Sequence, residues 1–301
     1  MSTFLSLTFS GLALGGIYFL AASGLTLIFG LMGILNFAQG LFMTLGAYAG
    51  YEVSLRLPAS PGAPMILVLA TVGAILGGAL AAGITEVLLI RPLYGRPLDQ
   101  ILVTIGLDLA IVALLEGIFG SNEVAIPVPV WVNGATYVGG VELPNAAFLA
   151  LGAGVIVFVG LETFLRRTRY GIIIRAGVEN RGMVSALGIN VGRAFTLVFV
   201  IGGAMAGLAG LLNTIAFNSD FVTPLQGDSL LIYSFIVVVI GGLGSIRGAA
   251  IAALAIALLQ LYTSYYIGSH PGWAQVGNFS VVLLLAIVLS VRPRGLFASV
   301  V

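Results

Sequence analysis

The chain lacks most of the residue types on which soluble enzymes depend. Its 301 residues contain no cysteine, a single histidine and only 8% charged residues. The absence of cysteine excludes disulfide bonds, thiolate metal sites and cysteine nucleophiles. One histidine gives little basis for a histidine-rich metal site or a Ser-His relay. Because soluble domains carry about 25% charged residues, the surface of this chain suits hydrocarbon better than water.

Lysine is also absent, because all 12 basic residues are arginine. The ATP-binding P-loop has the form GxxxxGK[ST], in which the lysine reaches the phosphates. The chain therefore cannot carry this ATPase site, and coupling to ATP would need a separate subunit. We expect no catalytic residues, no metal and no cofactor. A net charge of +1 excludes the basic surface with which proteins bind nucleic acid.

Hydrophobic residues, by contrast, make up 59% of the chain. A membrane-spanning helix needs about 20 apolar residues, and polar turns separate several runs of this kind. We expect an all-α, polytopic transmembrane bundle of about eight or nine spans, forming a single domain over residues 1–301. The stretch 229–248 leaves two alternatives open, a full span and a re-entrant or broken helix. The expected spans are 8–30, 36–55, 64–90, 100–120, 146–165, 194–217, 229–242, 249–268 and 273–291.

Glycine is about twice as frequent as in an average protein, with 42 residues. In membrane helices, small residues let two backbones approach closely. The number of GxxxG spacings predicts several tightly packed helices. These spacings are Gly11/Gly15, Gly46/Gly50, Gly73/Gly77, Gly203/Gly207 and Gly244/Gly248.

The arginines are unevenly distributed between the two predicted sides. When the nine spans alternate, eleven arginines fall on one side and only Arg56 falls on the other. Cytoplasmic loops of membrane proteins carry the excess of basic residues. We therefore predict a multi-pass protein of a bacterial or archaeal cytoplasmic membrane, with the N-terminus outside and the C-terminus in the cytoplasm. The loops at 121–145 and 218–228 are predicted to face outside.

Half of the arginines lie in one predicted cytoplasmic loop, residues 166–193. Within this loop, residues 176–187 are predicted to form about three helical turns, and Gly188 is a typical helix stop. Arg175 and Glu179 fall on its more polar positions. The pattern fits two arrangements equally, a helix that docks a cytoplasmic partner and an amphipathic helix on the bilayer surface.

Several polar residues are predicted to lie within the membrane. Asn36 and Gln39 are three residues apart, and Thr44 and Tyr48 continue this stripe after a predicted helix break at 30–36. Asp108 lies near the middle of its span, where an acidic residue is a functional candidate by default. These residues form our candidate solute pathway, with Asn213 and Asn218 as weaker candidates. The alternative is that they only form hydrogen bonds between helices.

Four segments together resemble the branched-chain amino acid ABC importer permeases of the LivH type. The resemblance covers nearly the whole chain, and the first two segments are specific to the family. The segments are GLALGGIYFLAASGLTLIFGLMGILNFAQGLFMTLGAY at 11–48, RYGIIIRAGVENRGMVSALGINVGRAFTLVFVIGGAMAGLAGLL at 169–212, VVVIGGLGSIRGAAIAAL at 237–254 and RPRGLF at 292–297.

The resemblance implies a permease that pairs with a related, LivM-like permease subunit. It also implies two cytoplasmic ATP-binding subunits and an external solute-binding protein. In such permeases the cytoplasmic loop docks on the ATPase, which here implies a docking role for Glu179, Ser185, Ala186 and Gly188, with Arg175 beside them. The family carries branched-chain or hydrophobic amino acids, and some relatives carry urea, short amides or other amino acids.

A second function class stays open at this point, an ion-coupled secondary transporter that acts alone. In that case Asp108 would be the coupling group. An intramembrane enzyme is poorly supported, because clustered histidines and cysteines are missing and no serine lies beside an evident base.

Overall fold

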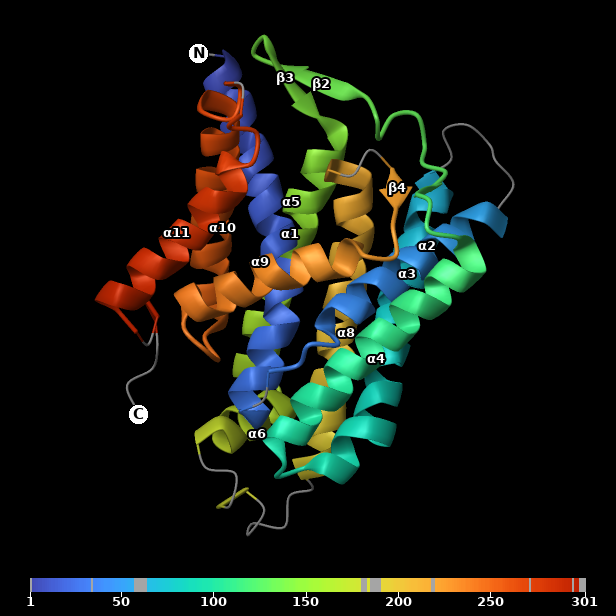
Figure 1. Ribbon diagram of the computed structural model, residues 1–301, viewed down its shortest axis with the longest axis vertical. Coiled ribbons are helices and arrows are strands. Elements are labelled where there is room, and N and C mark those ends of the chain that lie inside the picture. Colours follow the sequence, from blue (N-terminus) through green and yellow to red (C-terminus); the bar gives the residue numbers. More distant parts are fainter. Residues whose placement is uncertain are drawn as a thin grey trace.

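Long apolar helices form most of the protein, as the computed structural model in Figure 1 shows. It describes residues 2–33, 35–56, 64–179, 183–184, 191–217, 220–270, 272–293 and 295–297. The helices are α1 (Ser2–Met32), α2 (Gln39–Arg56), α3 (Pro64–Thr85), η1 (Glu86–Ile90), η2 (Arg91–Leu93), α4 (Pro97–Phe119), α5 (Asn145–Arg167), α6 (Arg169–Glu179), α8 (Val191–Phe217), α9 (Gln226–Gly241), α10 (Ile246–Tyr266) and α11 (Val276–Val291).

The helices confirm the predicted all-α transmembrane bundle. Among the described residues, six helices are long and apolar enough to cross a membrane, namely α1, α3, α4, α5, α8 and α10. The helices α9 and α11 are apolar but shorter. With 16 residues, α9 is about 24 Å long, which is less than the hydrocarbon thickness of about 30 Å. Figure 1 shows α9 lying across α1, which favours the re-entrant alternative for this stretch.

The centre of the bundle is formed by α1 and α8. In its most apolar stretch α1 is 89% buried, whereas the outer helices α4 and α5 are only 22% and 17% buried. A helix that is hydrophobic all round suits such a central position. The outer helices instead expose large apolar side chains such as Leu102, Leu109 and Ile156. In a membrane these side chains meet lipid or a neighbouring subunit.

Glycines bring α2, α3 and α8 into backbone contact. A Cβ atom added to Gly46 would lie 2.2 Å from the Cα of Gly207, and one added to Gly207 would lie 2.2 Å from the Ala74 carbonyl oxygen. On Gly78 a Cβ atom would lie 2.2 Å from the carbonyl oxygen of Gly203. Only glycine allows such contacts, so the tight packing predicted from the GxxxG spacings is confirmed for these helices.

Short strands cover one end of the bundle. β2 (Ala135–Val138) and β3 (Val141–Pro144) form an antiparallel hairpin. β1 (Val124–Ala125) pairs with β4 (Phe221–Val222), which joins the two loops predicted to lie on the same side. The arginine-rich segments gather at the opposite end, because Arg247 binds Glu162 of α5 and Arg91 binds Thr196 of α8. The two-sided arrangement predicted from the arginines therefore appears in the fold.

Candidate solute pathway

The helix break predicted at 30–36 lies between α1 and α2. Gly33 has a left-handed backbone with a φ of 67° and directly follows the end of α1. The Asn36 side chain accepts a hydrogen bond from the Ala38 backbone N–H through Oδ1, at 3.2 Å. Asparagine is well suited to such a turn before a helix. The chain thus turns sharply and begins α2 at Gln39, next to the start of α9.

The beginnings of α2 and α9 are packed directly on each other. The backbone N–H of Gly227 donates a hydrogen bond to the Thr44 side chain over 3.1 Å. A Cβ atom on Gly227 would lie 2.0 Å from the carbonyl oxygen of Gly40. The carboxyl of Asp108, on α4, is nearly buried and lies beside Asp228 and the Leu41 main chain. Two predicted pathway residues, Thr44 and Asp108, therefore meet at the start of α9.

The other predicted pathway residues point elsewhere. Gln39 is fully buried, and its Nε2 donates to the carbonyl oxygen of Gly202 on α8 at 3.3 Å. Tyr48 packs against Phe119 at the end of α4, with a ring separation of 4.6 Å. For Gln39 this geometry matches the alternative, a hydrogen bond between helices. The predicted stripe is therefore divided among three neighbouring helices.

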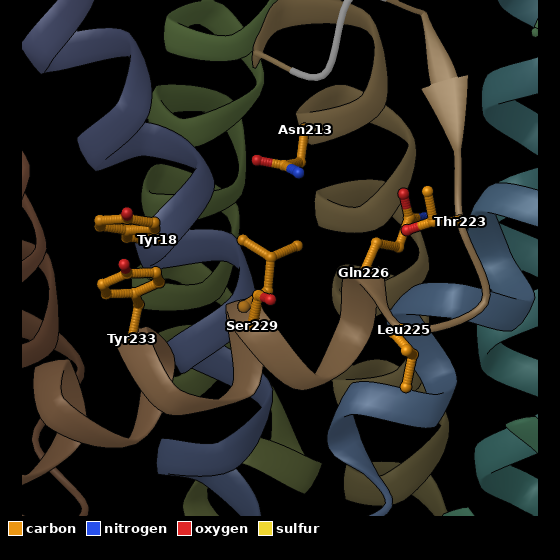
Figure 2. Close-up of a pocket in the computed structure, with 8 residues that line it drawn as sticks. Tyr18, Asn213, Thr223, Leu225, Gln226, Ser229 and Tyr233 are labelled. Atoms are coloured by element: carbon orange, nitrogen blue, oxygen red, sulfur yellow. The ribbon is translucent and has the colours of Figure 1, made fainter. Parts of the chain in front are cut away.

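A polar cavity of about 230 Å³ lies between α1, α8 and the start of α9. Figure 2 shows Tyr18 and Tyr233 on one side, Gln226 and Thr223 on the other, and Ser229 between them. Of its residues, only Asn213 was a candidate from the sequence. The sequence does contain a signal for this cavity that our prediction missed. Polar residues from Gln226 to Ser229 stand at the start of the otherwise apolar α9. The lining residues are Tyr18, Asn213, Thr223, Leu225, Gln226, Ser229, Leu230 and Tyr233.

Gln226 is a nearly buried polar residue of this cavity. It is only 6% exposed, and its Oε1 accepts a hydrogen bond from the Thr214 hydroxyl at 3.0 Å. Its Nε2 atom is buried and has no partner within the described part of the chain. An unpaired buried donor costs about 1–3 kcal/mol, so this position is one where a ligand group could be accommodated with a gain.

Ion pairs dominate the arginine-rich end. Glu86 in η1 is completely buried and accepts a hydrogen bond from the Thr196 hydroxyl at 2.7 Å, and it also binds Arg91 at 3.4 Å. Glu162 binds Arg166 at 2.5 Å and Arg247 at 2.6 Å. These contacts tie η1 to α8, and α5 to α10.

The predicted docking loop begins with α6, which covers Arg169–Glu179 and so starts before the helix predicted over 176–187. The early start has a local cause, because the Thr168 side chain accepts a hydrogen bond from the Gly171 backbone N–H at 3.0 Å and caps α6. Residues 180–182 and 185–187 of the predicted helix lie outside the described residues. On α6, Ile174 is buried in the main hydrophobic cluster.

The structure describes only part of the docking segment predicted from the sequence. Arg175 and Glu179 lie in α6, but the structure describes only their backbone. Ser185, Ala186 and Gly188 lie outside the described residues, as does Asn218 of the weaker pathway candidates.

The opposite end is anchored by Asp220, just after α8. Its backbone is left-handed, with a φ of 67°, and its carboxylate accepts a hydrogen bond from Asn133 at 2.6 Å. Burial raises the pKa of Asp220, and the Asn133 hydrogen bond partly opposes this rise. Together with the backbone bond from Ile126 to Asp220, at 2.8 Å, this contact holds the 121–145 loop over the end of α8.

Comparison with known proteins places this architecture among transport permeases. Residues 7–291 match the family model described as "Branched-chain amino acid transport system / permease component". The chain is 31% identical to the high-affinity branched-chain amino acid transport system permease protein LivH of Escherichia coli K12, across 97% of this chain and 95% of the relative.

Two further relatives also match over most of the chain. A probable branched-chain amino acid transport permease, LivM of Methanocaldococcus jannaschii, is 23% identical over 93% of this chain and 90% of its own. The ribose import permease RbsC of Haemophilus influenzae is 30% identical over 79% of this chain and 71% of its own. No solved structure matches the chain.

Proposed function

The chain belongs to the family of branched-chain amino acid transport system permeases, and from this premise we propose that it carries branched-chain amino acids into the cell. It is a membrane permease subunit and not an enzyme, because the family's permeases work with separate ATPase subunits and this chain has no lysine for a P-loop. The observation that carries the proposal is the family match, which extends over residues 7–291 and so includes every span.

The partners follow from this role. The importer consists of this chain, a second LivM-like permease, two cytoplasmic ATP-binding subunits and an external solute-binding protein. The similarity to a LivM protein supports a related partner permease, because the two sequences match over nearly their full length. The arginine-rich end faces the cytoplasm with the C-terminus, in a bacterial or archaeal inner membrane, as the positive-inside rule requires.

The segment from α6 to the start of α8 docks on the ATPase. Two observations support this position. The Thr168 cap and the ion pairs of Glu86 and Glu162 lie at this end of the bundle, so it is firmly held. Because Ile174 on α6 is buried in the central cluster, a displacement of α6 reaches the bundle interior directly. Docking involves Arg175, Glu179, Ser185, Ala186 and Gly188.

The decisive experiment reconstitutes the full complex in vesicles with its binding protein. We expect uptake of radiolabelled leucine that requires ATP and does not occur with an ion gradient alone. Uptake driven by the ion gradient without ATP would overturn the proposal. The family match gives no support to the ion-coupled alternative, so Asp108→Asn should leave the need for ATP unchanged.

The docking role is tested separately. We expect Glu179→Lys, and Gly188→Trp, to lower leucine uptake at least about tenfold while ATP hydrolysis continues and the complex still assembles. The matched control is Glu142→Lys, which reverses an exposed charge at the opposite end. Full uptake by both docking variants would exclude this segment as the docking element.

A further inference from the structure

We propose that the cavity between α1, α8 and α9 is a transit site that binds a zwitterionic aliphatic amino acid, with its carboxylate on Gln226. The inference rests on the proposed function and adds where in the permease the solute is held, and by which groups. It stands on the cavity itself and on the unpaired Nε2 atom of Gln226, which are independent observations.

Gln226 is oriented to present its amide N–H groups to a ligand. The Thr214 hydroxyl, which also lies 3.0 Å from the Gly210 carbonyl oxygen, holds Oε1 of Gln226. Nε2 is thereby left as a buried donor without a partner among the described residues. A carboxylate oxygen is the strongest natural acceptor for such a group, because hydrogen bonds to charged partners are about twice as strong as neutral ones.

The start of α9 strengthens this preference without donating directly. Its first N–H groups are already used: that of Gln226 binds the Thr223 carbonyl oxygen, that of Gly227 binds Thr44, and that of Asp228 binds the Leu225 carbonyl oxygen. The helix still carries a partial positive charge at this end, which favours an anionic group within the first turn. Asp228 lies in the same turn and offsets part of this field, so the Gln226 amide is the main donor to the carboxylate.

The rest of the lining suits a solute without net charge. None of the eight lining residues is acidic, arginine or histidine, and transferring a net charge into such a site without a partner is costly. Within the described residues, the side chains of Asn213, Thr223 and Ser229 form no hydrogen bond, and their oxygens can accept one from an ammonium group. Leu225 and Leu230 provide apolar contact for an aliphatic side chain.

One wall of the cavity is rigid and limits the size of the solute. The rings of Tyr18 and Tyr233 are stacked 5.0 Å apart. Their hydroxyls donate to Gln260 at 2.6 Å and to Asn278 at 2.8 Å. At about 230 Å³, the cavity is smaller than the sites of about 300–1,000 Å³ that hold drug-sized ligands. A single small amino acid is the ligand class of matching size.

The position of the cavity also fits a transit site. Tyr18 lies near the middle of α1, which runs from Ser2 to Met32. Transporters commonly bind solutes near the bilayer midplane, between helices that are broken or short. Here the start of the short α9 packs on the start of α2, just after the break, because Gly227 lies directly on the Gly40 carbonyl oxygen.

The first test uses the absence of cysteine from the chain. Ser229→Cys places a unique thiol of this chain in the cavity, and Ser269→Cys places one on an exposed turn as a control. The complex is reconstituted with its binding protein and ATP, and the rate of thiol modification is followed by mass spectrometry of this chain. We expect leucine to slow modification of Ser229→Cys at least about threefold, and ribose to have no effect.

The second test addresses the carboxylate. Gln226→Glu keeps the shape of the side chain but presents an oxygen to the substrate carboxylate, so we expect KM for leucine uptake to rise at least tenfold, with the KM of Gln100→Glu nearly unchanged. Gln100 is another buried glutamine, located at the arginine-rich end, and therefore controls for the effect of burying a charge.

The outcomes separate the two proposals. If the unsubstituted complex shows no ATP-dependent leucine uptake, the proposed function fails. If it transports leucine but leucine leaves Ser229→Cys unprotected, or protects both thiols equally, the transit site is wrong. A KM that rises equally in Gln226→Glu and Gln100→Glu would likewise exclude a specific carboxylate contact.

Discussion

The arginine-rich end and the middle of the bundle differ in how far their buried polar groups are paired. At the end, Glu86 is completely buried, yet Thr196, Arg91 and Tyr94 all bind its carboxylate. In the middle and toward the opposite end, polar atoms are left without partners among the described residues. They are Asn36 Nδ2, Gln39 Oε1, Tyr48 Oη, Asp108 Oδ1, Asp220 Oδ1 and Gln226 Nε2, whereas the arginine-rich end has one such atom among the described residues, Gln100 Oε1.

The difference separates structural polar groups from those available to a solute. A buried charge costs several kcal/mol unless it is paired, so the carboxylates at the end are placed where arginine can reach them. Unpaired buried groups persist only where the surrounding packing holds them. In this protein Asn36, Gln39, Asp108 and Gln226 lie around the starts of α2 and α9, where tight backbone contacts fix both helices.

The largest effect is expected from a methyl group placed between α2 and α9. In Gly227→Ala the new Cβ atom would meet the Gly40 carbonyl oxygen and the Thr44 hydroxyl, and neither can withdraw without moving a helix. We expect a loss of about 3 kcal/mol in stability and the loss of leucine uptake. Gly152→Ala is the control, because its Cβ would meet no atom within 4 Å. Thermal unfolding of the purified complex measures both.

A smaller effect is expected when the paired carboxylate is neutralised. Glu86→Gln removes the charge that binds Arg91, but Arg91 is 46% exposed and can regain water. We therefore expect a loss of about 2 kcal/mol in stability, below the range for fully buried pairs. The exposed pair of Glu52 and Arg56 provides the control, and Glu52→Gln should cost less than about 1 kcal/mol. Equal losses in the two variants would contradict the comparison.

The contact between Thr44 and Gly227 allows a still finer test. Thr44→Val keeps the shape of the side chain but leaves the Gly227 N–H without its acceptor. The expected cost is about 1 kcal/mol, together with a rise in KM for uptake, since the start of α9 carries the cavity. Thr71→Val removes only a bond to the Leu67 carbonyl within α3 and should leave KM unchanged.

The smallest effect is a pH dependence outside the membrane-spanning helices. Burial raises the pKa of Asp220 in the folded protein, so the folded state holds this proton more tightly than the unfolded state. The resulting stability is present below the unfolded pKa of about 3.9 and is lost as the pH rises through the raised folded pKa. Asp220→Asn should flatten this part of the stability profile, which denaturation at several pH values would reveal.

Sequence reasoning recovered the elements that depend on long apolar runs and on glycine spacing. Six of the nine predicted spans correspond to helices long and apolar enough to cross a membrane, and the glycine contacts of α2, α3 and α8 follow from spacing alone. The start of α6 was missed because its cap is a single threonine, Thr168, in an arginine-rich segment that looked like a loop.

The cavity could not be predicted from the sequence, for a different reason. Its residues come from α1, α8 and α9, which are far apart in the sequence, and only the crosswise position of α9 brings them together. Hydropathy shows how apolar a helix is, but the orientation of the helix in the bundle depends on tertiary contacts. The pairing of Thr44 with Gly227, and of Gly40 with Gly227, supplies those contacts.

Both ends of α9 are seated on glycine backbone. At its beginning Gly227 meets Gly40, and at its end Gly241 meets Gly248, where an added Cβ on Gly248 would lie 1.9 Å from the Gly241 carbonyl oxygen. Because both ends of α9 are packed at backbone contact distance, the helix cannot shift without moving its neighbours. Gly248 follows Arg247, which is bound to Glu162 of α5. The contacts from Glu162 through Arg247 and Gly248 to Gly241 therefore form one continuous connection between α5 and the helix that carries Gln226.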